Sequence, residues 1–159
     1  SALTSCCKLE KTRYKQSKSS MNYKIKVGCS IENLKNVRDF IRGSLKHHRI
    51  SELEVSEIVL AVDEMCSNLM IHAHHCNPDD LFELTIQVEK HSPLVFELVD
   101  DGTVFDINEF TTPAIDSMVH EKRKGGLGIR LVKSIMDKIE YERTNGRNIC
   151  RLVKNVHFE

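Results

Sequence analysis

Three short groups of residues combine types and spacings that could do chemistry. Glu64 and Asn68 lie four residues apart, so on a helix the carboxylate and the amide stand one turn above each other. Asp100 follows an apolar run, and Gly102 lets the backbone turn sharply and lets a ligand approach the acid. Residues 122–128, Lys-Arg-Lys-Gly-Gly-Leu-Gly, open a predicted helix, where free amides, glycines and lysines suit a phosphate.

Taken singly, these groups have ordinary interpretations as well. A polar helix face is usually solvated, and Glu64 and Asn68 share theirs with Glu57, His72 and His75, opposite the apolar stripe. Asp-Gly is a common turn, and a basic glycine-rich segment is as typical of a plain loop as of a phosphate site. The separate groups therefore leave both interpretations open.

Cysteine and histidine residues raise the question of a metal. The six cysteines show no regular framework and no C-x-x-C pair, which excludes a zinc ribbon; they are Cys6, Cys7, Cys29, Cys66, Cys76 and Cys150. We expect reduced thiols in a cytoplasmic protein. His72, His74, His75 and Cys76 form the densest group of metal-ligand types, but residues two apart on a helix point to different faces and no second ligand cluster exists. We favour helix-end histidines that face solvent or a cleft over zinc.

Composition limits the class of protein. The 159 residues carry 23 Lys+Arg and 23 Asp+Glu with 40% hydrophobic content, which suits one folded domain and argues against a dedicated nucleic-acid binder. No apolar run approaches the roughly 20 residues that span a bilayer. Residues 1–20 are polar and have five basic residues against one acidic. We expect them to be a disordered extension, the alternative being a basic tail that contacts membrane or nucleic acid.

Hydrophobic periodicity predicts the elements that must position the three groups. We expect a strand at 23–28, a helix from Ser30 as its cap through Leu45, and a longer helix capped by Ser51 that ends at 77–80. Two strands at 82–88 and 94–99 precede a long connection, 101–126, a helix after Gly128, and strands at 138–143 and 148–154. This order predicts an α+β two-layer sandwich, with helices on one face of a mixed, mostly antiparallel sheet.

Together the three groups resemble the motifs of one superfamily. Glu64-x-x-x-Asn68, Asp100-x-Gly102 and Gly125-Gly-Leu-Gly128 are similar to the N-box and the two glycine boxes of the GHKL, or histidine-kinase-like, ATPases. The element order suits that superfamily's Bergerat fold. Within it, the anti-sigma-factor serine/threonine kinases of bacterial partner-switching systems look closest, and the resemblance makes 21–159 a single ATP-binding domain.

The resemblance implies a role for each matching residue. Asn68 would ligate Mg²⁺ that bridges the ATP phosphates, and Glu64 would orient or deprotonate the attacking hydroxyl. Asp100 would accept a hydrogen bond from the adenine amino group, beside Gly102. The lid and the phosphate-binding start of the helix would be formed by Lys122, Lys124, Gly125, Gly126, Leu127 and Gly128.

Three positions depart from the family pattern. Val104 stands where many relatives have a second glycine, and Arg130 replaces a residue that is often aromatic. Asn148 or Ile149 occupies the place of a threonine near adenine. The first departure changes little, and the other two leave one base contact and the role of Arg130 open.

The function that the resemblance implies is phosphotransfer coupled to partner exchange. An ATP-dependent serine/threonine kinase would phosphorylate a STAS-type anti-anti-sigma protein and hold a sigma factor inactive, as a homodimer, without direct contact to nucleic acid or membrane. One alternative is a non-catalytic nucleotide-gated partner-switching module. A histidine-kinase catalytic domain is less favoured, because residues 1–20 contain no His.

The segment 107–124 is expected to be a lid. It has Pro113, little apolar periodicity and a basic end, Lys122-Arg-Lys124, directly before the glycines. A segment with few apolar residues opens at little free-energy cost, and phosphate charge can order it. We therefore expect it to be mobile without nucleotide and protected with it.

Overall fold

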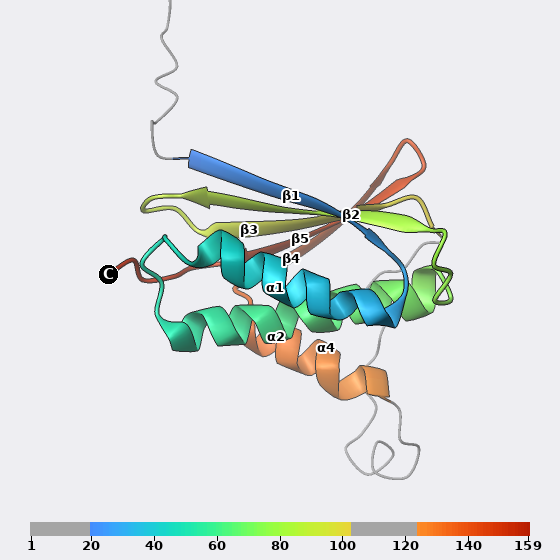
Figure 1. The fold of residues 1–159 in the computed structure, drawn as a ribbon, viewed down its shortest axis with the longest axis horizontal. Coiled ribbons are helices and arrows are strands. Elements are labelled where there is room, and N and C mark those ends of the chain that lie inside the picture. Colours follow the sequence, from blue (N-terminus) through green and yellow to red (C-terminus); the bar gives the residue numbers. More distant parts are fainter. Residues whose placement is uncertain (1–19, 103–123) are drawn as a thin grey trace, which may run out of the picture.

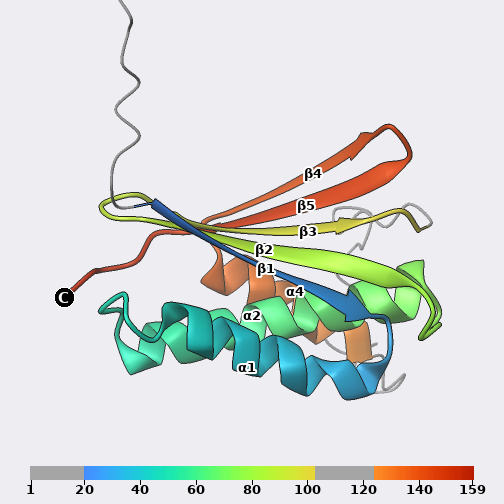
Figure 2. The same cartoon turned by 45° about the horizontal axis from the view of Figure 1, so that its top comes forward.

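The chain folds into two layers. A computed structural model describes residues 20–102 and 124–159, in which a five-stranded sheet carries helices α1, α2 and α4 on one face (Figures 1 and 2). The predicted α+β sandwich and the predicted order of elements are confirmed. Among the described helices, none is long and apolar enough to cross a membrane.

The sheet has the strand order β1-β2-β3-β5-β4. Its strands are β1 (Ser20–Gly28), β2 (Leu81–Glu89), β3 (Leu94–Asp100), β4 (Lys138–Thr144) and β5 (Arg147–Lys154). All four neighbouring pairs are antiparallel, so the expected mixed character is wrong for the described strands. The crossover from β3 through α4 makes β4 parallel to β3, but the β4–β5 hairpin inserts β5 between them.

The helices are α1 (Leu34–Leu45), α2 (Glu52–Asn68) and α4 (Lys124–Ile135), with short 3₁₀ and π segments at η1 (Ile31–Asn33) and η2 (Leu69–Ala73). Ser51 caps α2 as predicted, since its hydroxyl accepts a hydrogen bond from the Glu54 amide at 3.2 Å. Ser30 does not cap α1: it precedes η1, and its side chain makes no capping bond. Helix α4 begins at Lys124, so the glycines lie inside its first turns rather than before them.

Apolar side chains of the sheet and the helices meet in one core between the layers. Alternate residues of β2 and β3 point inward, as their predicted period of two requires. The largest fully buried side chains are Ile41, Leu45, Ile58, Met70, Phe82, Leu84, Ile86, Leu94, Phe96, Leu98 and Leu152. At the far edge, Asn145 and Gly146 adopt left-handed φ values of 53° and 75°, as a tight hairpin between β4 and β5 demands.

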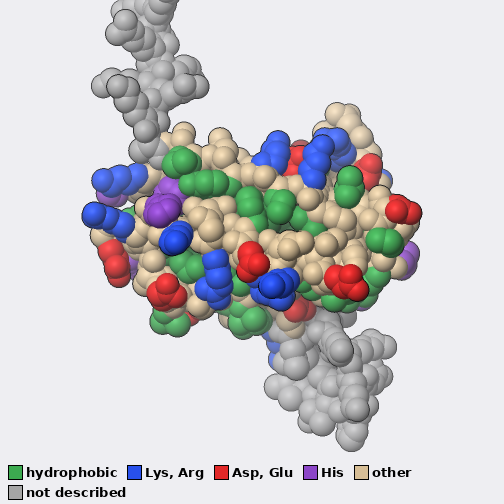
Figure 3. All heavy atoms as spheres, in the orientation of Figure 1, with side chains coloured by type: hydrophobic (Ala, Val, Ile, Leu, Met, Phe, Trp, Pro, Cys, Tyr) green, Lys and Arg blue, Asp and Glu red, His purple; other side chains and the backbone are tan. Residues whose placement is uncertain are grey.

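The face of the molecule that carries β1, α1 and α2 has charges of both signs (Figure 3). Figure 3 shows basic, acidic and apolar side chains interspersed there, in keeping with the zero net charge. Apolar side chains with at least 40% exposure include Met21, Ile31, Leu53, Leu60, Ile71 and Leu81.

Several sequence-based expectations fall outside the described residues. They concern the extension at 1–19, Cys6 and Cys7, Val104, Lys122, and most of the expected lid, 107–123. Ser20, which we assigned to the extension, is the first residue of β1. The described cysteines, Cys29, Cys66, Cys76 and Cys150, are free thiols.

Candidate functional site

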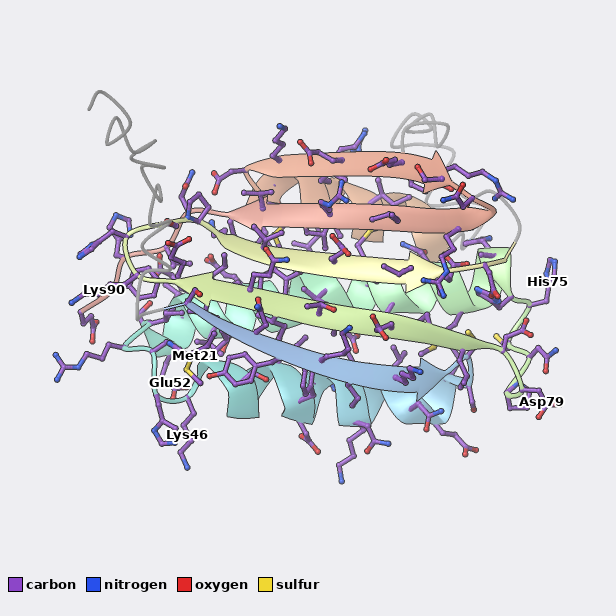
Figure 4. The ribbon with its side chains drawn as sticks, turned by 90° about the horizontal axis from the view of Figure 1, so that it is seen from above. Met21, Lys46, Glu52, His75, Asp79 and Lys90 are labelled. Atoms are coloured by element: carbon purple, nitrogen blue, oxygen red, sulfur yellow. The ribbon has the colours of Figure 1, made fainter. Side chains whose placement is uncertain are left out.

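The three groups of residues converge around the C-terminal half of α2. Helix α2 packs against α4, which brings Gly128 against Glu64, and one narrow pocket joins α2 to the end of β3. His75 and Asp79 mark this end of the molecule in Figure 4, opposite Lys46 and Lys90. The topology therefore brings the start of α4 and the end of β3, which are distant in the sequence, to the C-terminal half of α2.

Asp100 is the most firmly held acid of the site. Only 5% of the residue is exposed. Its Oδ2 atom lies 2.6 Å from Nε2 of His74 and accepts a 3.0 Å hydrogen bond from the Gly102 amide. The side-chain amide of Asn148 donates to the same oxygen over 3.4 Å. No described group donates a hydrogen bond to Oδ1.

Asn148, rather than Ile149, stands beside Asp100. It is 3% exposed and lies directly opposite Asp100 in the β3–β5 register. Its Oδ1 accepts hydrogen bonds from the hydroxyl of Tyr141 at 2.8 Å and from Nη1 of Arg143 at 2.7 Å. Its Nδ2 also donates to the Gly102 carbonyl at 3.1 Å. Of the two candidates, Asn148 and Ile149, the one beside Asp100 is therefore Asn148, whose polar side chain links β4 and β5 to the end of β3.

Sequence reasoning missed Tyr141 and Arg143. Both lie on β4, where Tyr141 pairs with Cys150 and Arg143 with Asn148. The period of two along β4 could have placed the pair on one face, but only the register of the β4–β5 hairpin decides that this face meets Asn148.

A narrow apolar pocket adjoins Asp100 and Asn148. It is lined by Met65 and Leu69 of the helical segment, by Leu98, Tyr141 and Cys150 of the sheet, and by the two polar residues. Its volume is about 20 Å³, room for about one water molecule. Apolar walls with a few convergent polar groups are typical of small-molecule sites.

Gly102 is required by its neighbours. A Cβ at this position would lie 2.6 Å from Cε1 of His74 and 2.9 Å from Oδ2 of Asp100. Such distances are too short for any real side chain, so the backbone can approach the buried imidazole only as glycine.

His74 contradicts the expectation that the histidines at the end of α2 face solvent or a cleft. It is 4% exposed, and its Nδ1 lies 3.0 Å from Oδ2 of Asp80. His72, His75 and Cys76 are exposed. Within the described residues, no group of three or more His, Cys, Asp or Glu is arranged to hold a metal ion.

Asn68 and Glu64 form the second polar part of the site. Asn68 is 3% exposed and therefore does not belong to a solvated helix face. Its side-chain amide donates to Oε1 of Glu64 over 3.5 Å, a long and weak hydrogen bond. Burial raises the pKa of Glu64, the nearby charge of Asp63 raises it further, and the Asn68 bond opposes both.

The start of α4 completes the site. A Cβ on Gly128 would overlap the side chain of Glu64, so the glycine lets α4 approach that carboxylate. Lys124, Gly125, Gly126 and Leu127 lie in the first turn of α4, where helix amides are free to bind an anion. Arg130 is exposed.

Comparisons with known proteins agree with this geometry. A family model described as a histidine kinase-like ATPase domain matches residues 29–154. The serine-protein kinase RsbW of Bacillus cereus is 23% identical over 130 residues, 79% of either chain. The serine/threonine-protein kinase BtrW of Bordetella bronchiseptica is 24% identical over 98 residues, 62% of this chain and 68% of that one. An anti-sigma F factor of Caldanaerobacter subterraneus is 26% identical over 106 residues, 65% of this chain and 71% of the relative.

Solved structures share the fold. The RsbU and RsbW domains of Rv1364c from Mycobacterium tuberculosis match with a TM-score of 0.58 at 12% identity; the match covers 86% of this chain and about a third, 32%, of that one. The SiaB-SiaC complex from Pseudomonas aeruginosa matches with a TM-score of 0.55 at 15% identity, covering 83% of this chain and 88% of the matched chain. The predicted resemblance to histidine-kinase-like ATPases and to anti-sigma kinases is confirmed.

Proposed function

This chain belongs to the histidine kinase-like ATPase domain family, and from that premise we propose that it is an ATP-dependent protein serine/threonine kinase. Its substrate is a STAS-type anti-anti-sigma protein, and in the complementary state the kinase holds a sigma factor inactive. The names of the relatives, serine-protein kinase and anti-sigma F factor, support both halves of this proposal. A cytoplasmic homodimer is part of the same proposal.

One observation carries the proposal: a firmly held acid and a loosely held acid lie on two sides of α2. Asp100 closes the narrow pocket under the helix, whereas Glu64 and Asn68 face the start of α4. A nucleotide has this division, with a flat base at one end and phosphates at the other.

The residues of the pocket fit an adenine base. Asp100 keeps Oδ1 for the 6-amino group, and apolar side chains of α2, β3 and β4 provide faces for the ring. The pocket must widen to admit the base, and the unbranched Met65 side chain is suited to move. A carboxylate accepts from the amino group of adenine but has no donor for the carbonyl of guanine, so these residues select ATP over GTP.

The phosphate side fits Mg²⁺ and the polyphosphate. Mg²⁺ prefers oxygen ligands and keeps several waters, so the side-chain oxygen of Asn68 together with phosphate oxygens suffices. The amides at the start of α4, with Lys122 and Lys124, would bind the phosphates. Bound Mg-ATP supplies the transferable phosphoryl group and neutralises its charge.

Glu64 is placed to handle the proton of the acceptor hydroxyl. Partial burial and Asp63 raise its pKa, and a raised pKa brings a carboxylate nearer to the value that suits a general base at neutral pH. Its weak bond to Asn68 leaves the carboxylate able to turn toward an incoming serine or threonine.

Mass spectrometry of the cognate STAS-type protein after incubation with this kinase and Mg-ATP tests the proposal. We expect one phosphate on a serine or threonine of the partner, no transfer when EDTA removes Mg²⁺, and none when that residue is alanine. Binding of Mg-ATP with unchanged partner mass would overturn phosphotransfer and leave the non-catalytic partner-switching module.

A further inference from the structure

His74 joins two carboxylates that belong to different parts of the chain. Its Nε2 lies 2.6 Å from Asp100 at the end of β3, and its Nδ1 lies 3.0 Å from Asp80 in the turn before β2. The imidazole is buried, as is Asp100, whereas the side chain of Asp80 is 43% exposed. Because carboxylates offer only acceptors, each ring nitrogen that bonds to one of these two carboxylates does so as the donor.

The backbone before and after His74 is built in an unusual way. Helix α2 passes into the π segment η2 at residues 69–73, and His75 and Cys76 follow with positive φ values of 49° and 57°. A positive φ outside glycine is a strained conformation, and π segments are frequent at functional sites. A hydrogen bond of 2.8 Å from the Cys76 amide to the Met70 carbonyl closes this turn, and the turn directs His74 inward.

The consequence concerns which oxygen of Asp100 meets a ligand. His74, the Gly102 amide and Asn148 all approach Oδ2, and none of them approaches Oδ1. The two oxygens of a carboxylate are equivalent, but the carboxylate plane can turn easily about χ2, which is a broad torsion, and such a turn would move the second oxygen relative to a ligand. The bond to His74, the shortest of the three, restricts this turning because it ties one oxygen to a buried ring, so the other oxygen keeps one position.

We propose that His74 is a positioning residue for base recognition: it fixes Oδ2 of Asp100 so that Oδ1 reads the 6-amino group of the purine. This inference rests on the proposed function, in which Asp100 reads adenine. Asp80 orients the imidazole from the other side and so determines which nitrogen faces Asp100.

The test compares ATP with purine riboside 5′-triphosphate, which lacks the 6-amino group. His74→Gln can place an amide donor near the position of Nε2, whereas His74→Asn can place one only near Nδ1, on the side of Asp80. His74→Leu removes both donors. Isothermal titration with each nucleotide gives the ratio of the two dissociation constants for the wild type and for every variant.

We expect His74→Leu and His74→Asn to weaken ATP about 5- to 100-fold, since a poorly paired buried polar group has a cost of this order. Their affinity for the analogue should stay near that of the wild type, and His74→Gln should restore most of the ratio. Equal weakening of both nucleotides in the Asn and Leu variants would overturn the inference, because a merely structural role lowers both affinities.

A wild type that fails to distinguish the two nucleotides would instead overturn adenine reading by Asp100, and the inference with it. If circular dichroism shows that His74→Leu does not fold, the comparison of His74→Gln with His74→Asn tests the inference without it. A ratio that is the same in His74→Gln and His74→Asn then rejects the positioning role.

Discussion

Two carboxylates of the site are held in opposite ways. Asp100 is 5% exposed, and three donors approach one of its oxygens from β5, from the loop after β3 and from the residue that follows η2. Glu64 is partly exposed, and its one described hydrogen bond, from Asn68, is 3.5 Å long. The first acid cannot turn without breaking strong contacts, and the second can turn at little cost.

This difference matches the two tasks that we propose. Recognition of a base requires an acceptor that is already in place, because any ordering on binding reduces affinity. Proton transfer requires a group whose pKa is shifted and whose carboxylate can follow the reacting hydroxyl. The glycines repeat the contrast: Gly102 faces a buried imidazole, whereas Gly128 faces the movable side chain of Glu64.

The largest expected effect is on the loosely held acid. Glu64→Gln should lower phosphotransfer to the partner by about 10²- to 10⁴-fold, the usual contribution of a general base. The dissociation constant for Mg-ATP should change little, since the glutamine retains the size of the side chain. Single-turnover kinetics at saturating ATP measure the rate of phosphotransfer, and calorimetry measures the dissociation constant for Mg-ATP as the control. Retained activity would move the base elsewhere.

Asp100→Asn should have the opposite effect, a loss of ATP affinity that is larger than the loss of phosphotransfer at saturating ATP. The amide presents a donor to His74 or to the adenine amino group, so ATP binding should weaken by about 1–3 kcal/mol. Phosphotransfer at saturating ATP should fall much less than in Glu64→Gln. Equal affinity of the wild type for ATP and GTP would contradict adenine reading, and a loss of transfer without a loss of affinity would reverse the two roles.

Much of this contrast was predictable from residue types and spacing. The motifs identified Glu64, Asn68, Asp100 and Gly102, and periodicity placed them on a helix and at a strand end. The burial of His74 was not predictable, because it depends on the π segment and on two consecutive left-handed residues that turn the chain inward.

Contacts that depend on strand register were also beyond the sequence. Tyr141 and Arg143 reach Asn148 only because the β4–β5 hairpin pairs residue 143 with residue 148. A shift of one residue would turn both side chains to the opposite face. The wholly antiparallel order of the described strands has the same origin, since hairpin pairing rather than local propensity inserts β5 beside β3.

The glycines provide a matched pair of substitutions. Gly102→Ala should destabilise the fold by about 1–3 kcal/mol, as overpacking against a fixed buried ring does, and should weaken ATP. Gly128→Ala lies in a helix, where alanine is favoured by about 1 kcal/mol, and the displaced Glu64 can swing away. Its stability should therefore change little while phosphotransfer falls.

Urea unfolding of the single and double variants tests this pair. In a Glu64→Ala background the overlap at residue 128 disappears, so Gly128→Ala should become stabilising, whereas Gly102→Ala should remain destabilising. If Gly128→Ala destabilised both backgrounds equally, Glu64 would not be the group that it displaces.

The smallest expected effect is the dependence of stability on pH at Glu64. Burial and then Asp63 raise its pKa above the ordinary value of 4.5. The folded protein therefore binds this proton more tightly than the unfolded chain, and stability falls as pH rises from the ordinary value through the raised one. Above the raised pKa of the folded protein, the full destabilisation by ionised Glu64 is present. Glu64→Gln should accordingly increase the free energy of unfolding at pH 7, and the gain should vanish below the ordinary value.

Glu54, on the same helix, provides a control of opposite sign. Burial raises its pKa, but hydrogen bonds from His157 and Ser51 outweigh that effect, so the pKa is lowered. This carboxylate stabilises the fold above its unfolded pKa and loses that contribution as pH falls through the lowered value. Glu54→Gln should therefore decrease the free energy of unfolding at pH 7. Urea titrations at pH 7 and near pH 4 measure both changes. A loss of stability at pH 7 in both variants would contradict the raised pKa of Glu64, because it would show that this carboxylate stabilises the fold when it is charged.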